Sequence, residues 1–123
     1  MRVFLTGSTG QVGGELVRAL TDHDVVTGAR PAFDLLDERT VRAAISGAVP
    51  DVVIHAAAYT DVDGCERDPD LAFRVNGVGT WNLAAVCGAH NMTMLYVSTD
   101  FVFDGRKREP YTGSLRSRGT GIS

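Results

Sequence analysis

The chain has 123 residues, of which 44% are hydrophobic and 22% charged, and its formal net charge is -3. These values are typical of one soluble globular domain and exclude a disordered chain. No general attraction to nucleic acid follows from this charge, and no apolar run approaches the ~20 residues of a membrane span, so we expect a cytoplasmic protein without nucleic-acid or membrane partners.

Strands and helices are predicted to alternate along the first half of the chain. Residues 2–6, RVFLT, form an apolar run that ends in glycines, as in a buried strand of a parallel sheet. Apolar residues at positions 12, 16 and 20 predict a helix over about 11–20. A second strand is expected over 24–27, and a short third strand over 33–35.

The second half continues the alternation. Asp37 has the position of an N-cap, and its helix ends before Pro50. Residues 51–55, DVVIH, are the strongest strand candidate in the chain. After a polar loop, a proline begins a longer helix over about 69–88, and a last strand follows over 94–98.

This alternation predicts an α/β fold, a Rossmann-like doubly wound parallel sheet with strand order 3-2-1-4-5. A ligand crevice is expected at the carboxyl ends of the strands. Residues 1–112 would form this NAD(P)-binding domain. The composition changes at Gly113, and residues 113–123 are expected to be a tail without fixed structure. The last strand is expected to be an exposed edge, which predicts marginal stability or self-association.

The sequence TGSTGQVG, residues 6–13, connects the first strand to the first helix. Gly7 allows a tight turn, Gly10 lets the backbone approach a pyrophosphate, and Gly13 lets the helix pack closely on the sheet. Backbone N–H groups at the helix start would hold the phosphates. The motif predicts a dinucleotide cofactor, with a purely structural glycine turn as the alternative.

The end of the second strand indicates which dinucleotide is bound. It reads Gly28-Ala29-Arg30, without the acid that binds the ribose 2′-hydroxyl in NAD enzymes. The Arg30 guanidinium therefore favours NADP(H), with NAD(H) as the alternative. Asp34 lies beyond the strand, where it would either face the adenine or be a solvated turn acid.

Two further segments follow predicted strands. HAAAYT, residues 55–60, contains small side chains that leave room for the flat ring of a nicotinamide, although tight strand packing would explain them equally. Ser98, Thr99 and Asp100 place two hydroxyls and an acid after the last strand. A hydroxyl there can stabilise the oxyanion that forms when a ketone accepts a hydride.

Neither the cysteines nor the histidines form a metal-binding pattern. Cys65, in an expected loop, and Cys87, in an expected helix, match no disulfide framework and are predicted to be free thiols. His23, His55 and His90 show no i, i+4 pairing, so no metal site is predicted.

With TGSTGQVG, the segments AAAYTDVDGCE, VNGVGTWNLA and VSTDFVFDG give residues 1–112 a specific resemblance to a known family. The chain resembles dTDP-4-dehydrorhamnose reductase, an extended short-chain dehydrogenase/reductase. This family reduces the 4-keto group of dTDP-4-dehydro-6-deoxy-L-mannose in making dTDP-L-rhamnose. The resemblance implies NADPH as cofactor and a dTDP-sugar as substrate. A homo-oligomer is a further expectation.

The resemblance also assigns expected roles to matching residues. The phosphates would be bound by Gly7, Gly10, Gln11, Val12 and Gly13. The adenine would be bordered by Asp34 and Leu35, and the nicotinamide side would be lined by Ala57, Ala58, Tyr59 and Thr60. Asn76 would be the helix asparagine near the active site. Thr99 and Asp100 would lie beside the keto sugar, with Thr99 as the catalytic hydroxyl.

One part of the family pattern is absent from these 123 residues. The family takes its proton from the tyrosine of a Y-x-x-x-K pair, whereas Tyr111 is followed by leucine at position 115. We therefore expect a truncated form, from a shortened reading frame, a degenerate gene copy or a fragment, without substantial reductase activity alone. The alternative is a non-catalytic NADP-binding module similar to the regulatory subunit of methionine adenosyltransferase, and a nucleotide-sugar epimerase or dehydratase is a weaker one.

Overall fold

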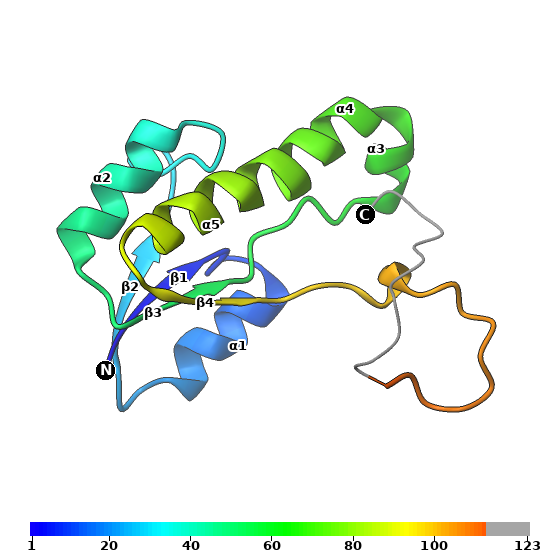
Figure 1. Cartoon of the computed structure of the whole chain (residues 1–123), viewed down its shortest axis with the longest axis horizontal. Coiled ribbons are helices and arrows are strands. Elements are labelled where there is room, and N and C mark those ends of the chain that lie inside the picture. Colours follow the sequence, from blue (N-terminus) through cyan, green and yellow to red (C-terminus); the bar gives the residue numbers. More distant parts are fainter. Residues whose placement is uncertain (113–123) are drawn as a thin grey trace.

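The computed structural model describes residues 1–112, apart from the side chains of Val62 and Phe101. Within this range a parallel sheet lies between helix α1 (Gln11–Ala19) on one face and helices α2 (Glu38–Ala48) and α5 (Thr80–Ala89) on the other (Figure 1). Its strands, β1 (Arg2–Thr6), β2 (Asp24–Gly28), β3 (Val52–His55) and β4 (Thr93–Tyr96), have the order β2-β1-β3-β4. The predicted α/β fold with a Rossmann-like parallel sheet is confirmed.

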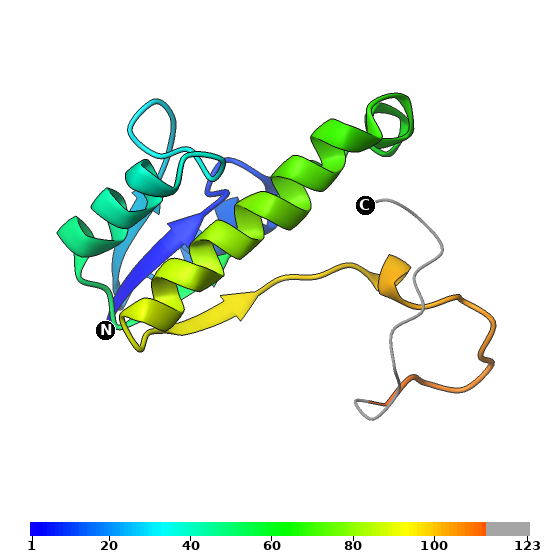
Figure 2. The same ribbon diagram turned by 45° about the horizontal axis from the view of Figure 1, so that its top comes forward.

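Local sequence signals explain where the main helices begin. The Asp37 side chain accepts a hydrogen bond from the Arg39 N–H at 3.0 Å, so the predicted cap of α2 is present. Asp68 similarly caps α4 (Pro69–Ala72), which continues through the π-helical segment η1 (Phe73–Gly79) into α5. Figure 2 shows these three elements as one continuous helical rod, in agreement with the long helix predicted over about 69–88.

The core consists of two apolar clusters, one on each face of the sheet. On the α2 and α5 face it contains Phe4, Phe33, Val41, Ile45, Val53, Leu83, Val86 and Cys87. On the α1 face it contains Val3, Leu5 and Ile54, against which Leu16 of α1 and its C-cap residue Leu20 pack. Strands β1 and β3 are therefore buried on both faces, which explains why their sequences are apolar throughout instead of alternating.

The prediction of a short strand over 33–35 is wrong, because residues 33 and 34 have no regular secondary structure and Leu35 begins a turn. Phe33 is buried against Phe4, with ring centroids 5.4 Å apart, and the Leu36 N–H donates to Asp34 Oδ1 at 2.9 Å. The Phe33 ring is held in the core and the Asp34 side chain holds a local turn, so the segment does not pair with the sheet. The predicted order loses its outermost strand, and the other strands keep their order.

A second correction concerns the polar loop after β3. It contains a short helix, α3 (Val62–Arg67), whose Gly64 N–H donates to the Asp61 side chain at 3.0 Å. Cys65 is therefore in a helix and buried, although the sequence placed it in a loop, and Cys87 lies in α5 as predicted. Both thiols are free.

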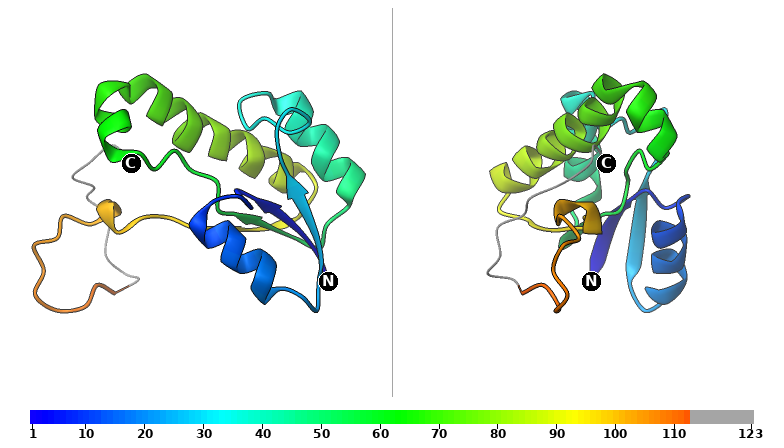
Figure 3. Two further views of the ribbon diagram at one scale, coloured as in Figure 1. Left: turned by 180° about the vertical axis from the view of Figure 1, so that it is seen from behind. Right: turned by 90° about the vertical axis from the view of Figure 1, so that its right-hand side faces the viewer.

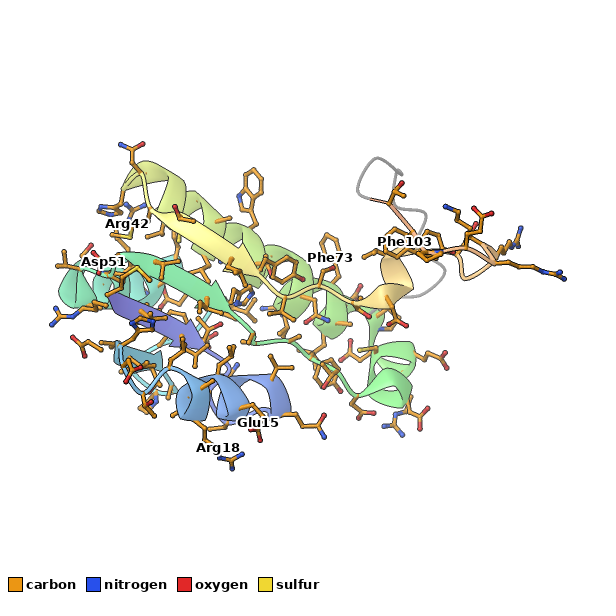
Figure 4. All side chains as sticks on the ribbon, turned by 90° about the horizontal axis from the view of Figure 1, so that it is seen from below. Glu15, Arg18, Arg42, Asp51, Phe73 and Phe103 are labelled. Atoms are coloured by element: carbon orange, nitrogen blue, oxygen red, sulfur yellow. The ribbon has the colours of Figure 1, made fainter. Side chains whose placement is uncertain are left out.

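Some apolar side chains remain uncovered in the described part of the chain. Strand β4 pairs only with β3, so the expected open edge is observed there. Leu95 on β4 is 53% exposed, and Phe73 and Trp81 on the helical rod are 67% and 72% exposed. Figure 3 shows α1 on the face of the sheet opposite to α2 and α5, and Figure 4 labels Phe73 on the helical rod. Self-association through these surfaces stays a prediction.

Two other expectations concern the C-terminal tail and membrane-spanning helices. The tail expected over 113–123 lies outside the described residues. Among residues 1–112, each helix is too short or too polar to cross a membrane. The segment before the tail forms a loop in which Phe103 stacks on Tyr111, with ring centroids 4.2 Å apart.

Candidate functional site

The glycine loop after β1 is built from close backbone contacts. Gly7 has φ +75°, a conformation that favours glycine. A Cβ atom on Gly7 would lie 2.6 Å from the Ala57 nitrogen, and one on Gly13 would lie 2.6 Å from the Gly7 carbonyl carbon. The loop is therefore held between the start of α1 and the segment after β3, with no room for a side chain at either glycine.

The start of α1 differs from the starts of the neighbouring helices. Its N-cap, Gly10, makes no side-chain capping bond, and its first turn has no acidic residue. Helices α2, α3 and α4 are each capped by an aspartate side chain. The first N–H groups of α1 thus keep their hydrogen-bonding capacity and the positive end of the helix dipole, which suits an anionic group such as a phosphate.

A cleft beside this loop, the glycine-loop cleft, has a volume of ≈ 470 Å³. It is lined by Thr6, Gly7, Ser8, Thr9, Gly28, Ala29, Arg30, Phe33, Asp34, Leu35, Leu36, Ala57, Ala58 and Val75. Arg30 Nη2 lies 3.7 Å from Asp34 Oδ2, so the two charged residues expected near the adenosine share one wall of this cleft. The Asp34 side chain is 37% exposed and its Oδ1 accepts from the Leu36 N–H at 2.9 Å, so this residue both lines the cleft and stabilises the local turn.

A second cleft, the Tyr96 cleft, has a volume of ≈ 270 Å³. It is lined by Val12, Ala56, Ala58, Tyr59, Thr60, Asn76, Tyr96, Val97, Ser98 and Thr99. Asn76 Oδ1 accepts from the Tyr59 N–H at 2.7 Å, and Asn76 Nδ2 donates to the Tyr59 carbonyl at 3.0 Å. This pair of bonds fixes the backbone between the two clefts against η1.

A buried polar chain lies behind both clefts. His55 is 0% exposed, with Nδ1 2.6 Å from Thr6 Oγ1 and Nε2 2.9 Å from Thr80 Oγ1. Burial lowers the pKa of His55 to about 4, so the imidazole is neutral at pH 7. The Ala57 N–H donates to Thr6 Oγ1 at 3.3 Å, which extends the chain to the wall of the glycine-loop cleft.

The structure brings most of the predicted residues together. Gly7, Arg30, Asp34, Leu35 and Ala57 line the glycine-loop cleft. Val12, Tyr59, Thr60, Asn76 and Thr99 line the Tyr96 cleft, and Ala58 lines both. The helix start is formed by Gly10, Gln11 and Gly13.

Asp100 lies outside the lining of both clefts, exposed at the start of η2 (Asp100–Val102). Its carboxylate accepts a long hydrogen bond, 3.3 Å, from Thr99 Oγ1. The pair therefore stays in contact, but only Thr99 faces a cleft.

Sequence reasoning missed several residues that line the clefts, namely Thr6, Ser8, Thr9, Phe33, Val75 and Tyr96. A positional signal could have found Thr6 and Tyr96. They are the last residues of β1 and β4, and the carboxyl ends of parallel strands meet at one edge of a sheet. Among residues 1–112, no group of His, Cys, Asp or Glu side chains could hold a metal ion.

Comparison with known proteins gives a consistent result. The family model of the RmlD substrate binding domain matches residues 1–117. A curated relative, dTDP-4-dehydrorhamnose reductase of Sinorhizobium fredii, is 41% identical over 112 residues, which cover 90% of this chain and 38% of that protein. The chain thus spans less than half the length of the curated relatives it matches.

Two solved structures show how far the fold is shared. A dTDP-4-dehydrorhamnose reductase of Bacillus anthracis in complex with NADP has a TM-score of 0.92 and 32% identity, covering 98% of this chain and 44% of that one. A UDP-glucose 4-epimerase of Thermus thermophilus in complex with NAD has a TM-score of 0.85 and 26% identity, covering 99% of this chain and 46% of that one. The shared fold therefore occurs with either cofactor.

Proposed function

This chain belongs to the family of the RmlD substrate binding domain, and from this membership we propose that it is the cofactor-binding part of an NADPH-dependent nucleotide-sugar reductase. The substrate that we propose is dTDP-4-dehydro-6-deoxy-L-mannose, and the product of the reductase is dTDP-L-rhamnose. This assignment is supported by the reductase names of the relatives and by the NADP bound in the Bacillus anthracis structure.

The observation that carries the proposal is the backbone packing around Gly7. A side chain at Gly7 or Gly13 would collide with backbone atoms, so the loop is held at the wall of the glycine-loop cleft and leads directly into the start of α1, which has no side-chain cap. This arrangement fits the pyrophosphate of a dinucleotide, because N–H groups and the helix dipole favour negative charge there. The residues present therefore fit NADP(H), which supplies a hydride when bound.

The chain's own residues would have separate roles around the cofactor. The Arg30 guanidinium would bind the 2′-phosphate that distinguishes NADP(H) from NAD(H). Asp34 partly neutralises this charge, because its carboxylate lies 3.7 Å from Arg30, so we expect a moderate preference. In the second cleft, the Thr99 hydroxyl would hydrogen-bond to the keto oxygen of the sugar and stabilise negative charge on it.

Replacing Arg30 by alanine should reduce the preference for NADPH over NADH. We expect the wild-type chain to bind NADPH more tightly than NADH. In Arg30→Ala the affinity for NADPH should fall about tenfold, because a charge-assisted contact is lost. NADH affinity should change less than about twofold, since that contact does not form with a 2′-hydroxyl. Isothermal titration of both nucleotides at one fixed ionic strength measures the four dissociation constants.

Arg18→Ala is the matched control for charge. Arg18 pairs with Glu15 on the outer side of α1, and Figure 4 shows both side chains pointing away from the sheet. Removing it should leave the NADPH to NADH ratio unchanged. Equal affinity of the wild-type chain for the two nucleotides, or an equal effect of both substitutions, would contradict the proposed cofactor preference.

We further propose that the 123-residue chain does not turn over the sugar by itself. Its tyrosines at 59, 96 and 111 are followed four residues later by Asp63, Asp100 and Leu115, so a lysine that could lower a tyrosine pKa is missing from each pair. Mixing the chain with NADPH and dTDP-4-dehydro-6-deoxy-L-mannose should give no decrease in NADPH absorbance above the rate without protein. Enzyme-dependent oxidation of NADPH with formation of dTDP-L-rhamnose would refute this proposal.

The turnover experiment gives the same result for the alternative function, so the partner of the chain is what separates the two. A non-catalytic NADP-binding module would use the same glycine-loop cleft, and it would bind NADPH without oxidising it, whatever sugar is added. Recovery of a methionine adenosyltransferase together with the chain would favour the module.

We also propose a homo-oligomer and a cytoplasmic location. In a homo-oligomer, a second copy would cover the exposed side chains of Leu95 and Trp81.

A further inference from the structure

Two polar contacts attach the helical rod to the end of β3 and to the segment that follows it, and only one of them involves a rod residue expected at the site. Asn76 binds the Tyr59 backbone, with bonds of 2.7 and 3.0 Å. One turn further along, Thr80 Oγ1 lies 2.9 Å from His55 Nε2. The two contacts lie at His55 and Tyr59, on either side of Ala57 and Ala58, which line the clefts.

The Ala57 N–H, which can only donate, indicates which atom donates in each hydrogen bond around His55. Thr6 Oγ1 already accepts from the Ala57 N–H at 3.3 Å, and Thr6 is 0% exposed. Its hydroxyl hydrogen needs a buried acceptor, and His55 Nδ1, at 2.6 Å, provides one. The His55 proton is then on Nε2, which donates to Thr80 Oγ1. The result is one continuous chain of bonds from α5 to the Ala57 amide.

We propose that His55 is a positioning residue, whose imidazole links Thr80 of α5 to Thr6 of β1 and thereby holds residues 57–60 in place for the nicotinamide half of the cofactor. This inference rests on the proposed function, because it takes the nicotinamide side of NADP(H) to lie along these residues. His55 itself lines neither cleft, so it acts through Thr6 and the Ala57 amide.

A second contact connects His55 with the wall of the Tyr96 cleft. The imidazole stacks on the Tyr96 ring, with centroids 5.3 Å apart and planes 21° apart. Tyr96 is half-exposed and lines the cleft together with Thr99. Displacement of His55 would therefore disturb Tyr96 in one cleft and the Thr6–Ala57 wall of the other, whereas no hydrogen bond among the described residues joins His55 to Arg30 or Asp34.

The test compares two ligands that differ in the nicotinamide half. NADPH contains both halves, and adenosine 2′,5′-bisphosphate contains only the adenosine half with its 2′-phosphate. In Thr80→Val and His55→Leu we expect NADPH affinity to fall about tenfold, while affinity for the bisphosphate changes less than about twofold. Thr80→Val keeps the shape of the side chain and is the informative variant if His55→Leu fails to fold.

Val86→Ala is the control for a purely structural effect, because Val86 is buried in α5 but belongs to the apolar core. It should lower the melting temperature without changing the ratio of the two affinities. If His55 were only structural, Thr80→Val and His55→Leu would behave like Val86→Ala. An unchanged ratio, or equal weakening of both ligands, overturns the proposal.

Hydrogen exchange at the Ala57 amide, measured without ligand, separates this inference from the proposed function. Thr80→Val should accelerate exchange at Ala57 about tenfold, and Val86→Ala should not do so beyond its global effect. If the wild-type chain bound neither ligand, the proposed function would fail, and the Ala57 amide would still decide whether His55 holds this segment. Unchanged exchange in Thr80→Val overturns the positioning role.

Discussion

Gly13→Ala is expected to destabilise the fold by about 3 kcal/mol and to abolish detectable NADPH binding. A Cβ atom at this position would lie 2.6 Å from the Gly7 carbonyl carbon and 2.9 Å from Ser8 Cα. Both are backbone atoms, so no side-chain rotation can relieve the collision. Helix α1 must move away from the glycine loop, which opens the core cluster of Leu5, Leu16 and Leu20 on that face.

Gly14→Ala is a control in the same helix turn. A Cβ atom at Gly14 would lie 3.8 Å from the Ser8 carbonyl oxygen, an ordinary van der Waals distance. Alanine is favoured over glycine inside a helix by about 1 kcal/mol, so this variant should be as stable as the wild type or more stable. Urea unfolding and NADPH titration of both variants measure the two effects. Similar results for Gly13→Ala and Gly14→Ala would mean that the close contact with Gly7 is unimportant.

Acidification is expected to remove roughly 3 kcal/mol of stability as the pH falls from 6.5 to 4, through His55 alone. Burial lowers the pKa of His55 from 6.5 to about 4 in the folded chain. In this interval the unfolded chain binds a proton that the folded chain does not bind, so lower pH favours unfolding. Above pH 6.5 and below pH 4 the two states carry the same charge at His55, and its contribution is constant.

His55→Leu should abolish this pH dependence, because the titrating group is removed, even if the variant is less stable at every pH. Val86→Ala should be less stable but keep the wild-type slope. Asp37 also has a lowered pKa, because Arg39 binds its carboxylate, but its contribution is lost only as the pH falls below about 4. Urea unfolding at half-unit pH steps measures the slope. A stability that is flat between pH 6.5 and 4 would contradict the burial of a neutral imidazole.

Much of the fold follows from local patterns in the sequence. Apolar runs such as residues 52–55 identify strands buried on both faces, and the capping aspartate at position 37 marks where α2 begins. These signals act over a few residues, so they are legible without knowledge of the tertiary structure. The glycine loop belongs to the same class, because its spacing between a strand and a helix already indicates close backbone contact.

The segment around Phe33 shows where local patterns fail. Its apolar and polar residues alternate as in a strand, but Phe33 packs against Phe4, which is far away in the sequence, and Asp34 binds the Leu36 amide. Helix α3 was missed for a different reason, since its Asp61 cap is followed by few apolar residues. In both cases the competing contacts decide the conformation, and the hydrophobic pattern does not contain them.

For the site, the sequence by itself determined which segments meet, because the ends of parallel strands lie at one edge of the sheet. Most of the residues that it predicted for the site, from Gly7 to Thr99, therefore line one of the two clefts. Only the tertiary structure revealed the link from Thr6 through His55 to Thr80, residues that lie 49 and 25 positions apart. The physical reason is that a hydrogen bond between buried side chains depends on distances and directions across three elements, and no local pattern of residue types specifies them.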